Sequence, residues 1–160
     1  MRPLRSLLFL AVLLWAAEVT ATSNYEYGPN EYVTICNGMS PNGRFAVTAH
    51  GEGEGGIDNF HLYLTDAKRG QNLCVLSEVV NTLDTGATAL AAKWSDDSQR
   101  VTIVYRVDRH EPLKAVSYRL SDGGARCIQA PFDVAGGELL RYWRKAKPSK
   151  RVFGDRKPHP

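Results

Sequence analysis

No two of the three cysteines in this chain stand at the short spacing that zinc sites use, so we expect no structural zinc site. The serines show no Gly-x-Ser-x-Gly elbow, and the glycine-rich stretch lacks the Gly-Lys-Ser/Thr ending of a phosphate-binding loop. The apolar run from Leu7 to Ala17 has eleven residues, whereas a membrane-spanning helix needs about 20. We therefore expect no enzymatic activity and no cofactor.

That apolar run has the features of a secretory signal peptide. Arg2 and Arg5 precede it, and Val19-Thr20-Ala21 supplies the small residues that a signal peptidase requires. We predict that residues 1–21 are cleaved and that the protein is secreted or periplasmic, with no membrane span after cleavage. The alternative is an uncleaved anchor.

The cleaved chain would keep Cys36, Cys74 and Cys127, an odd number in a compartment where disulfides form and persist. At most one internal disulfide can form, and the sequence leaves all three pairings open. The alternative is that all three are small buried apolar residues.

Charge is divided unevenly along the chain. Residues 22–140 contain 10 Lys and Arg against 15 Asp and Glu, a net charge of −5, whereas residues 141–160 contain 8 against 1, a net charge of +7. Within residues 136–160 we expect a short helix over Glu138–Lys147, followed by a disordered basic tail. Four basic side chains of this tail are candidates for binding an anionic surface: Lys150, Arg151, Arg156 and Lys157. The alternative is that the tail is only solvated and binds nothing.

The strongest pattern in the sequence is a repeat. Residues 39–47 and 94–102 contain similar motifs, with Ser40 and Ser95 at matching positions. Self-similarity at a fixed spacing indicates two copies of one supersecondary unit. The repeat predicts the architecture of the protein, but it does not predict its activity.

Each copy alternates apolar and polar residues with the period of two that half-buried strands require. Gly, Asp, Asn or Ser stands at each reversal, so we predict two four-stranded antiparallel meanders. The expected strands cover residues 32–36, 45–49, 60–65 and 73–76 in the first copy, and 89–94, 101–107, 113–120 and 126–128 in the second. The prediction is an all-β domain over residues 22–135, with repeats at about 31–77 and 89–130.

A Ser-Pro-Asn-Gly-Arg turn, a Leu-Tyr-Leu-x-Asp-Ala strand end and an Ala-x-Trp-Ser-x-Asp-Ser-x-x-Val stretch resemble WD-type β-propeller repeats. They are most similar to the repeats of the periplasmic Tol translocation propeller. The sequence departs from that pattern at Asn42, where Asp is usual, and at Asp96, where Pro is usual. The matching residues are Ser40, Pro41, Gly43, Arg44, Leu62, Tyr63, Leu64, Asp66, Ala67, Gly70, Trp94, Ser95, Asp97, Ser98 and Val101.

The resemblance implies two propeller blades, whereas closed propellers have typically 4 to 8. Exposed edge strands invite aggregation, so two blades need another arrangement. We expect either a sandwich of the two sheets packed face to face or a compact two-sheet monomer whose edges are covered by the C-terminal segment. The alternative is a ring of several copies of the chain.

Alternate turns of a meander lie at opposite ends of its sheet, so charged residues of both copies should gather at one end. We call these eight candidates for binding the acidic loop face: His50, Glu52, Glu54, Asp58, Asp108, Arg109, His110 and Glu111. Clustered carboxylates on a glycine-rich loop could ligate a hard cation, but the order of an EF-hand is missing. The alternative is a solvated, flexible loop.

These patterns predict a secreted or periplasmic, non-enzymatic interaction module that binds a partner protein or an envelope component. Secretion argues against nucleic acid as the partner. One alternative is a metal-assisted ligand-binding or hydrolytic protein that uses the acidic loop face. Another is attachment to an anionic envelope surface through the basic tail.

Overall fold

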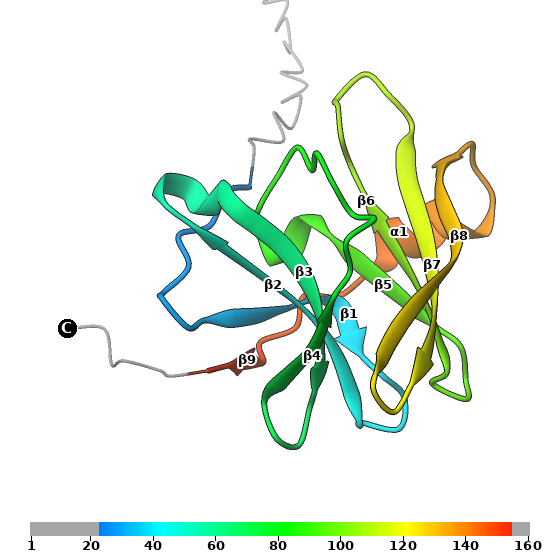
Figure 1. Cartoon of the computed structure of the whole chain (residues 1–160). Coiled ribbons are helices and arrows are strands. Elements are labelled where there is room, and N and C mark those ends of the chain that lie inside the picture. Colours follow the sequence, from blue (N-terminus) through cyan, green and yellow to red (C-terminus); the bar gives the residue numbers. More distant parts are fainter. Residues whose placement is uncertain (1–22, 155–160) are drawn as a thin grey trace, which may run out of the picture.

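Eight strands form two consecutive four-stranded antiparallel meanders (Figure 1). The computed structural model describes residues 23–154, and the predicted signal peptide lies outside them. The first meander consists of β1 (Tyr32–Met39), β2 (Phe45–Glu52), β3 (Asp58–Asp66) and β4 (Gln71–Val75), and the second of β5 (Ala91–Trp94), β6 (Arg100–Tyr105), β7 (Leu113–Ser121) and β8 (Gly124–Val134). Two 3-10 turns (Glu54–Gly56 and Ala87–Ala89), helix α1 (Glu138–Lys145) and strand β9 (Val152–Phe153) complete the fold. The predicted all-β fold, with two meanders and a short C-terminal helix, is confirmed.

The first copy of the repeated motif forms a tight turn between β1 and β2. Asn42 Oδ1 accepts hydrogen bonds from Ser40 Oγ and from Arg44 N, both at 2.9 Å. Gly43 then adopts a positive φ of 68°, which glycine tolerates without strain. Ser40 Oγ also accepts a hydrogen bond from Phe45 N at 2.9 Å, which fixes the start of β2.

The second copy repeats these hydrogen bonds between β5 and β6. Asp97 Oδ1 accepts from Ser95 Oγ at 2.5 Å and from Gln99 N at 3.0 Å, and Ser98 takes the positive φ of 59°. The two turns touch, because Asn42 N donates to Ser98 Oγ at 3.1 Å. The sequence repeat is therefore a repeat in structure down to single hydrogen bonds.

The two meanders join through their first strands into one continuous sheet. β1 and β5 pair in parallel, with Cys36 opposite Ala91, and Cys36 N donates to Leu90 O at 3.0 Å. The strand order is β4-β3-β2-β1-β5-β6-β7-β8. The expected two-sheet arrangement was wrong, because pairing β1 with β5 satisfies backbone groups that separate sheets would leave at their edges.

This junction makes the two meanders turn opposite faces toward the core. Phe45 and Val47 of β2 lie in the core, and the residues at the same positions of the repeat in β6 are Arg100 and Thr102. In β6 it is Val101 that lies in the core, so Arg100 and Thr102 point to the outer face. Two meanders that extend in opposite directions from parallel first strands must differ in this way.

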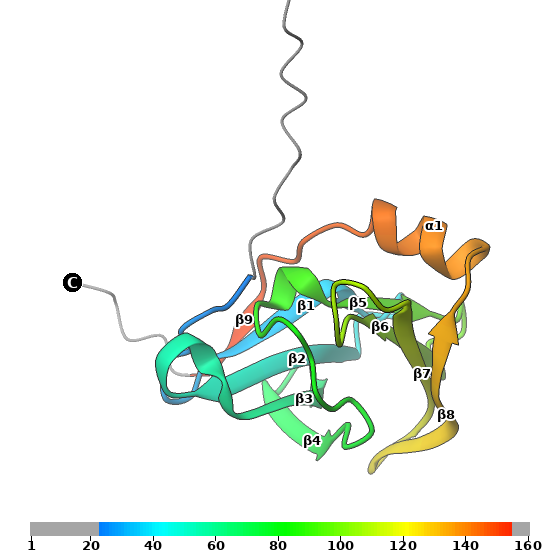
Figure 2. The same cartoon turned by 90° about the horizontal axis from the view of Figure 1, so that it is seen from above.

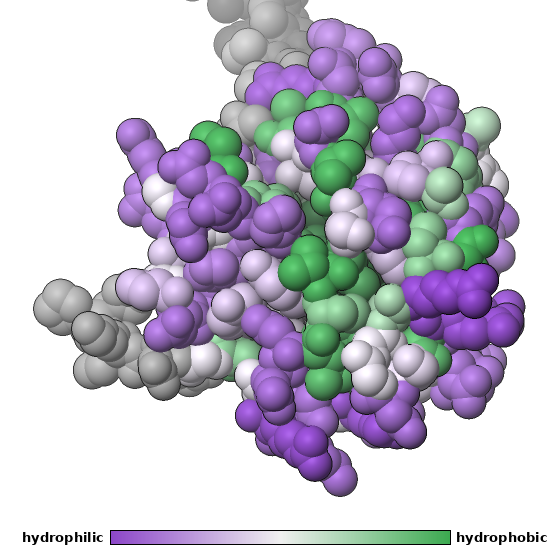
Figure 3. Space-filling model, in the orientation of Figure 1, coloured by the Kyte–Doolittle hydropathy of each residue, from purple (hydrophilic) through white to green (hydrophobic). Residues whose placement is uncertain are grey.

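The inner face of the curled sheet holds the main core, and the connection between the meanders covers it through Leu76, Val79 and Leu90. The curl brings the edge strands β4 and β8 within 8 Å at their nearest Cα atoms. Figure 3 shows apolar side chains in a band on this side of the molecule, and Val75 and Ile128 are 44% and 45% exposed. The buried strand residues of this core include Ile35, Leu62, Leu64, Ile103, Val116 and Tyr118.

The C-terminal residues pair with the part of β1 that β5 leaves free and continue over the outer face (Figure 2). They do not cover the outermost strands β4 and β8, which we expected the C-terminal segment to cover. Leu139, Leu140 and Trp143 of α1 pack on the outer face of the second meander. Phe153 of β9 packs on Ala46 at the outer face of the first. The edge strands are protected differently: β4 has only 5 residues and β8 contains Pro131, which cannot donate a backbone hydrogen bond.

The basic stretch after α1 is hydrogen-bonded to β1 between Lys147 and Phe153, and the end of the predicted disordered tail, residues 155–160, lies outside the described residues. Thr34 N of β1 donates to Arg151 O, and Asn37 N donates to Lys147 O, both at 3.0 Å. β9 continues this pairing, with Val33 opposite Val152. Main-chain pairing needs no apolar periodicity, so a charged, proline-punctuated sequence gives no sign of it.

Cys36, Cys74 and Cys127 are all free thiols on three different strands. Burial raises the pKa of the Cys36 thiol. Only Cys36 is buried, whereas Cys74 and Cys127 are half-buried against the main core, and the possible disulfide stays a prediction. Across residues 23–154, no helix combines the length and the apolar character needed to cross a membrane.

Candidate functional site

The structure places the loops of the predicted acidic loop face at one end of the sheet, as expected from the meander order (Figure 1). The β2–β3 loop carries Glu54, and the β6–β7 loop carries Asp108, Arg109, His110 and Glu111. The connection between the meanders lies between these loops (Figure 1). No three His, Cys, Asp or Glu side chains within residues 23–154 are grouped so that they could hold a metal ion.

His50 is buried on the outer face of β2. Its Nδ1 atom lies 2.7 Å from Glu31 O, and its ring lies 4.7 Å from the ring of Tyr32 and 5.7 Å from the ring of Tyr27. Burial is the main cause that raises the pKa of Tyr27. His50 is thus the centre of an aromatic cluster rather than an accessible ligand.

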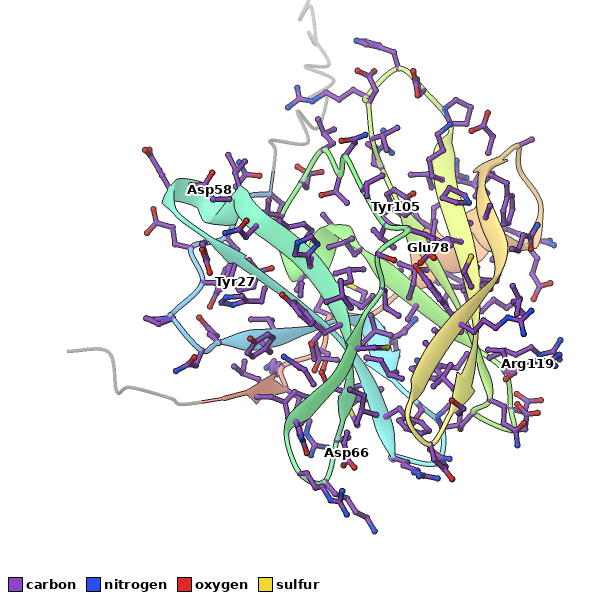
Figure 4. All side chains as sticks on the ribbon, viewed as in Figure 1. Tyr27, Asp58, Asp66, Glu78, Tyr105 and Arg119 are labelled. Carbon is purple, nitrogen blue, oxygen red and sulfur yellow. The ribbon has the colours of Figure 1, made fainter. Side chains whose placement is uncertain are left out.

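The other residues of the acidic loop face are exposed, and two of them, Glu52 and Asp108, accept hydrogen bonds within their own loops. Glu52 Oε2 accepts a hydrogen bond from Asn59 Nδ2 at 2.9 Å, and Asp108 Oδ1 accepts one from His110 N at 2.7 Å. Figure 4 shows Asp58 far from Glu78, which lies over the inside of the sheet. These hydrogen bonds each stay within one loop.

A different group of charged residues is aligned by the sheet itself. Arg100 of β6 stands opposite Arg119 of β7, and Arg119 stands opposite Arg126 of β8. All three are exposed on the outer face, and Figure 4 shows Arg119 extending away from the sheet. We call these three residues the arginine row. Neighbouring strands are about 4.8 Å apart, so the row presents three guanidinium groups across roughly 10 Å.

Like charges directly opposite each other destabilise a sheet. Among the described residues the salt bridges are Arg44–Asp122, Lys93–Glu138 and Lys114–Asp133, so neither Arg119 nor Arg126 has a carboxylate partner. The row is therefore a concentrated and largely uncompensated positive charge.

The Arg100 charge acts on Asp97, whose carboxylate is already engaged in hydrogen bonds. The hydrogen bond from the Ser95 hydroxyl is the largest cause that lowers the pKa of Asp97, followed by the Gln99 N–H, with the Arg100 charge contributing less. A surface depression of about 380 Å³ is lined by Asp97, Gln99, Arg100 and Arg119. It leaves room for an oxyanion beside two arginines.

A second row of polar side chains runs beside the arginine row on the same outer face. Thr102 stands opposite Ser117, and Ser117 stands opposite Gln129. The hydroxyls of Thr102 and Ser117 lie 2.8 Å apart. Together the two rows offer cationic forks and neutral hydrogen-bonding groups on one strip of sheet.

Inside the sheet, titratable groups are used for packing. Tyr118 is 1% exposed, and burial followed by the nearby Glu78 carboxylate raises its pKa. Burial also raises the pKa of Tyr105. Both phenols therefore stay protonated at neutral pH.

The basic residues predicted to bind through the tail are placed differently from the arginine row. Arg151 donates to Ala67 O at 2.5 Å, and its guanidinium lies 4.8 Å from the centre of the Phe153 ring. Lys150 is exposed, while Arg156 and Lys157 lie outside the described residues. The sequence reasoning missed the arginine row, because strand alternation indicates a face but not the register between strands.

Comparison of this chain with protein-family models, with curated proteins and with solved structures finds no match. The binding surface is therefore argued from the geometry of the outer face.

Proposed function

We propose that the protein is a secreted, non-enzymatic binding module that attaches to an acidic polysaccharide through the arginine row. The observation that carries the proposal is the in-register alignment of Arg100, Arg119 and Arg126 without ion-pair partners for the last two. Each guanidinium can bind a carboxylate or sulfate through two parallel hydrogen bonds. A polymer that carries such groups along its length would relieve the repulsion between the three arginines.

The composition of the strip favours a polysaccharide over other polyanions. Thr102, Ser117 and Gln129 beside the row can exchange hydrogen bonds with sugar hydroxyls. The two rows contain no aromatic side chain on which unpaired bases would stack, and no apolar side chain that would insert into a lipid bilayer. The predicted signal peptide would bring the protein to the compartment where such polymers occur.

The proposal keeps the expected interaction module, but its binding surface is the arginine row on the sheet and neither the acidic loop face nor the basic tail. We also propose that the two meanders are related to WD-type propeller blades. The matching turns at Ser40 and Ser95 and the four-strand order of each copy support that relationship.

The test is titration calorimetry of the full chain with polygalacturonate at low ionic strength. The double variant Arg119→Gln/Arg126→Gln should bind more than about tenfold more weakly, because two charge-assisted contacts are lost. The matched control is Arg141→Gln/Arg144→Gln, which removes the same charge from exposed positions on α1. Its affinity should stay within about twofold of the parent.

Equal losses in the two double variants would show that only net charge matters, and they would overturn the arginine row as a site. Binding to anionic phospholipid vesicles or to single-stranded DNA, without binding to polygalacturonate, would overturn the polysaccharide assignment.

A further inference from the structure

A groove of about 520 Å³ lies where β1 and β5 diverge beyond their pairing at Cys36 and Ala91. Met39, Trp94 and Pro148 are among its apolar lining residues, and Asn37, Tyr142 and Lys147 are among its polar ones. The lining thus comes from both meanders and from the C-terminal segment. The acidic loop face lies at the opposite ends of these strands and contributes nothing to the groove.

Hydrogen bonds hold the wall of the groove in place. The Tyr142 hydroxyl donates to Ala92 O at 2.8 Å, and Asn37 Nδ2 donates to the same hydroxyl oxygen at 3.1 Å. Asn37 also pairs with Lys147 in both directions, through Lys147 N to Asn37 Oδ1 at 3.2 Å and Asn37 N to Lys147 O at 3.0 Å. A ligand would therefore meet a site that is already ordered, which lowers the entropy cost of binding.

The chemistry of the groove suits a ring with an apolar face and one negative charge. Trp94 and Tyr142 supply flat aromatic surface. Lys147 is exposed, and no salt bridge among the described residues involves its ammonium group. A pyranose ring presents C–H groups on its faces, and a uronic acid adds one carboxylate at its rim.

The groove and the arginine row flank the same hairpin turn. Trp94 ends β5, the next residue Ser95 donates its N–H to Arg100 O at 2.9 Å, and Arg100 begins the row. Trp94 stands opposite Val101 and packs on the inner side of the sheet, whereas the arginine row lies on the outer side. A chain of acidic sugars that occupies both must therefore bend around this turn at the end of the sheet.

We infer that the groove holds one uronic acid residue, with its ring against Trp94 and its carboxylate paired with Lys147. The inference rests on the proposed function, since it names the sugar of the same acidic polymer. A small aromatic carboxylate would offer similar chemistry and is an outcome of the test.

The experiment follows the indole N–H signals of the full chain by nitrogen-15 NMR, with trigalacturonic acid as the probe. The chain has three tryptophans, and Trp94→Phe assigns the relevant signal. We expect trigalacturonic acid to shift the Trp94 signal and neutral maltotriose to leave it unchanged. Lys147→Gln should weaken this binding about fivefold, as expected for the loss of one exposed ion pair.

The matched control is Lys150→Gln, which removes the same charge from an exposed lysine outside the groove lining and should leave the affinity within about twofold. The inference is overturned if the Trp94 signal does not move, if maltotriose moves it equally, or if both lysine variants lose the same affinity. A stronger response to benzoate than to trigalacturonic acid would also overturn it, in favour of an aromatic carboxylate.

The Arg119→Gln/Arg126→Gln variant separates this inference from the proposed function. If that variant still binds polygalacturonate normally while the Trp94 signal responds to trigalacturonic acid, the proposal for the arginine row is overturned and the inference for the groove is supported. If polygalacturonate binding depends on the arginine row while the Trp94 signal does not shift, the inference for the groove is overturned and the proposal for the row is supported.

Discussion

The outer faces of the two meanders differ in what covers them. On the first meander, β9 packs against Ala46, and Thr48 and His50 are also buried. On the second, α1 covers Val104 and Ala115, and the arginine row beyond them stays exposed. The two copies of the repeat thus have different outer faces, one covered and one partly exposed. We propose that the exposed, charged outer face of the second meander is the binding surface.

The difference between the two outer faces is tested most strongly by introducing one glutamate on the outer face of each meander. Thr48 and Thr102 each pair with a hydroxyl across the strand, with Thr65 at 2.9 Å and Ser117 at 2.8 Å. Thr48→Glu buries an unpaired carboxylate and should lower the free energy of unfolding by about 3 to 5 kcal/mol. Thr102→Glu, half-exposed beside the arginine row, should change it by about 1 kcal/mol or less. Urea unfolding curves measure both, and similar losses would contradict the difference between the faces.

The cover on the first meander should itself contribute to stability. Phe153 is 7% exposed and packs in a small cluster with Ala46 and Ala67. Phe153→Ala should lower the free energy of unfolding by about 3 kcal/mol, the low end for such a change, because the cluster is small. The half-buried Val152→Ala should cost clearly less. An unchanged urea midpoint for Phe153→Ala would mean that the C-terminal segment is not docked in solution.

Removing one arginine of the arginine row should raise the free energy of unfolding, whereas Phe153→Ala should lower it. Arg119 stands between Arg100 and Arg126, so Arg119→Gln should raise the free energy of unfolding by roughly 0.2 to 1 kcal/mol. The gain should shrink in high salt, because salt screens exposed charges. Melting temperatures at two salt concentrations measure it, with Arg144→Gln as the control. A loss of stability at low salt would show that the row is already compensated.

The smallest expected effect compares the two matching turns. Asp97 and Asn42 accept equivalent hydrogen bonds, but only Asp97 titrates. Because the pKa of Asp97 is lowered in the folded state, its contribution to stability is present above the unfolded pKa, near 3.9, and disappears as pH falls through the lowered value. Asp97→Asn should therefore lower the melting temperature at pH 7 and match the parent at the acid end of the titration. A pH-independent difference would contradict this assignment.

Local structure was predictable from the sequence because turns and strand alternation depend on near neighbours. Ser40 and Ser95 correctly marked two identical turns, and the strands around them follow the period of two. The WD-type family relationship stays a prediction, as do the signal peptide and the roles of the acidic loop face. Only the placement of His50 in a buried cluster changes how that face is read.

The rest depended on contacts between segments far apart in the chain. The parallel pairing of Cys36 with Ala91 decides which face of each meander is inside, and no local pattern reports it. The alignment of Arg100, Arg119 and Arg126 requires the register of three strands. The order at Arg151 comes from main-chain pairing with β1, which side-chain composition does not reveal.

The most direct test of the binding proposal is a map of NMR chemical-shift changes when a polygalacturonate oligomer is added to the full chain. We predict that the changes concentrate on the backbone and guanidinium signals of Arg100, Arg119 and Arg126, while Tyr63 and His61 of β3 in the first meander stay unchanged. Changes that concentrate on the first meander or on the loops at Glu54 and Glu111, with the arginine row unaffected, would contradict the account.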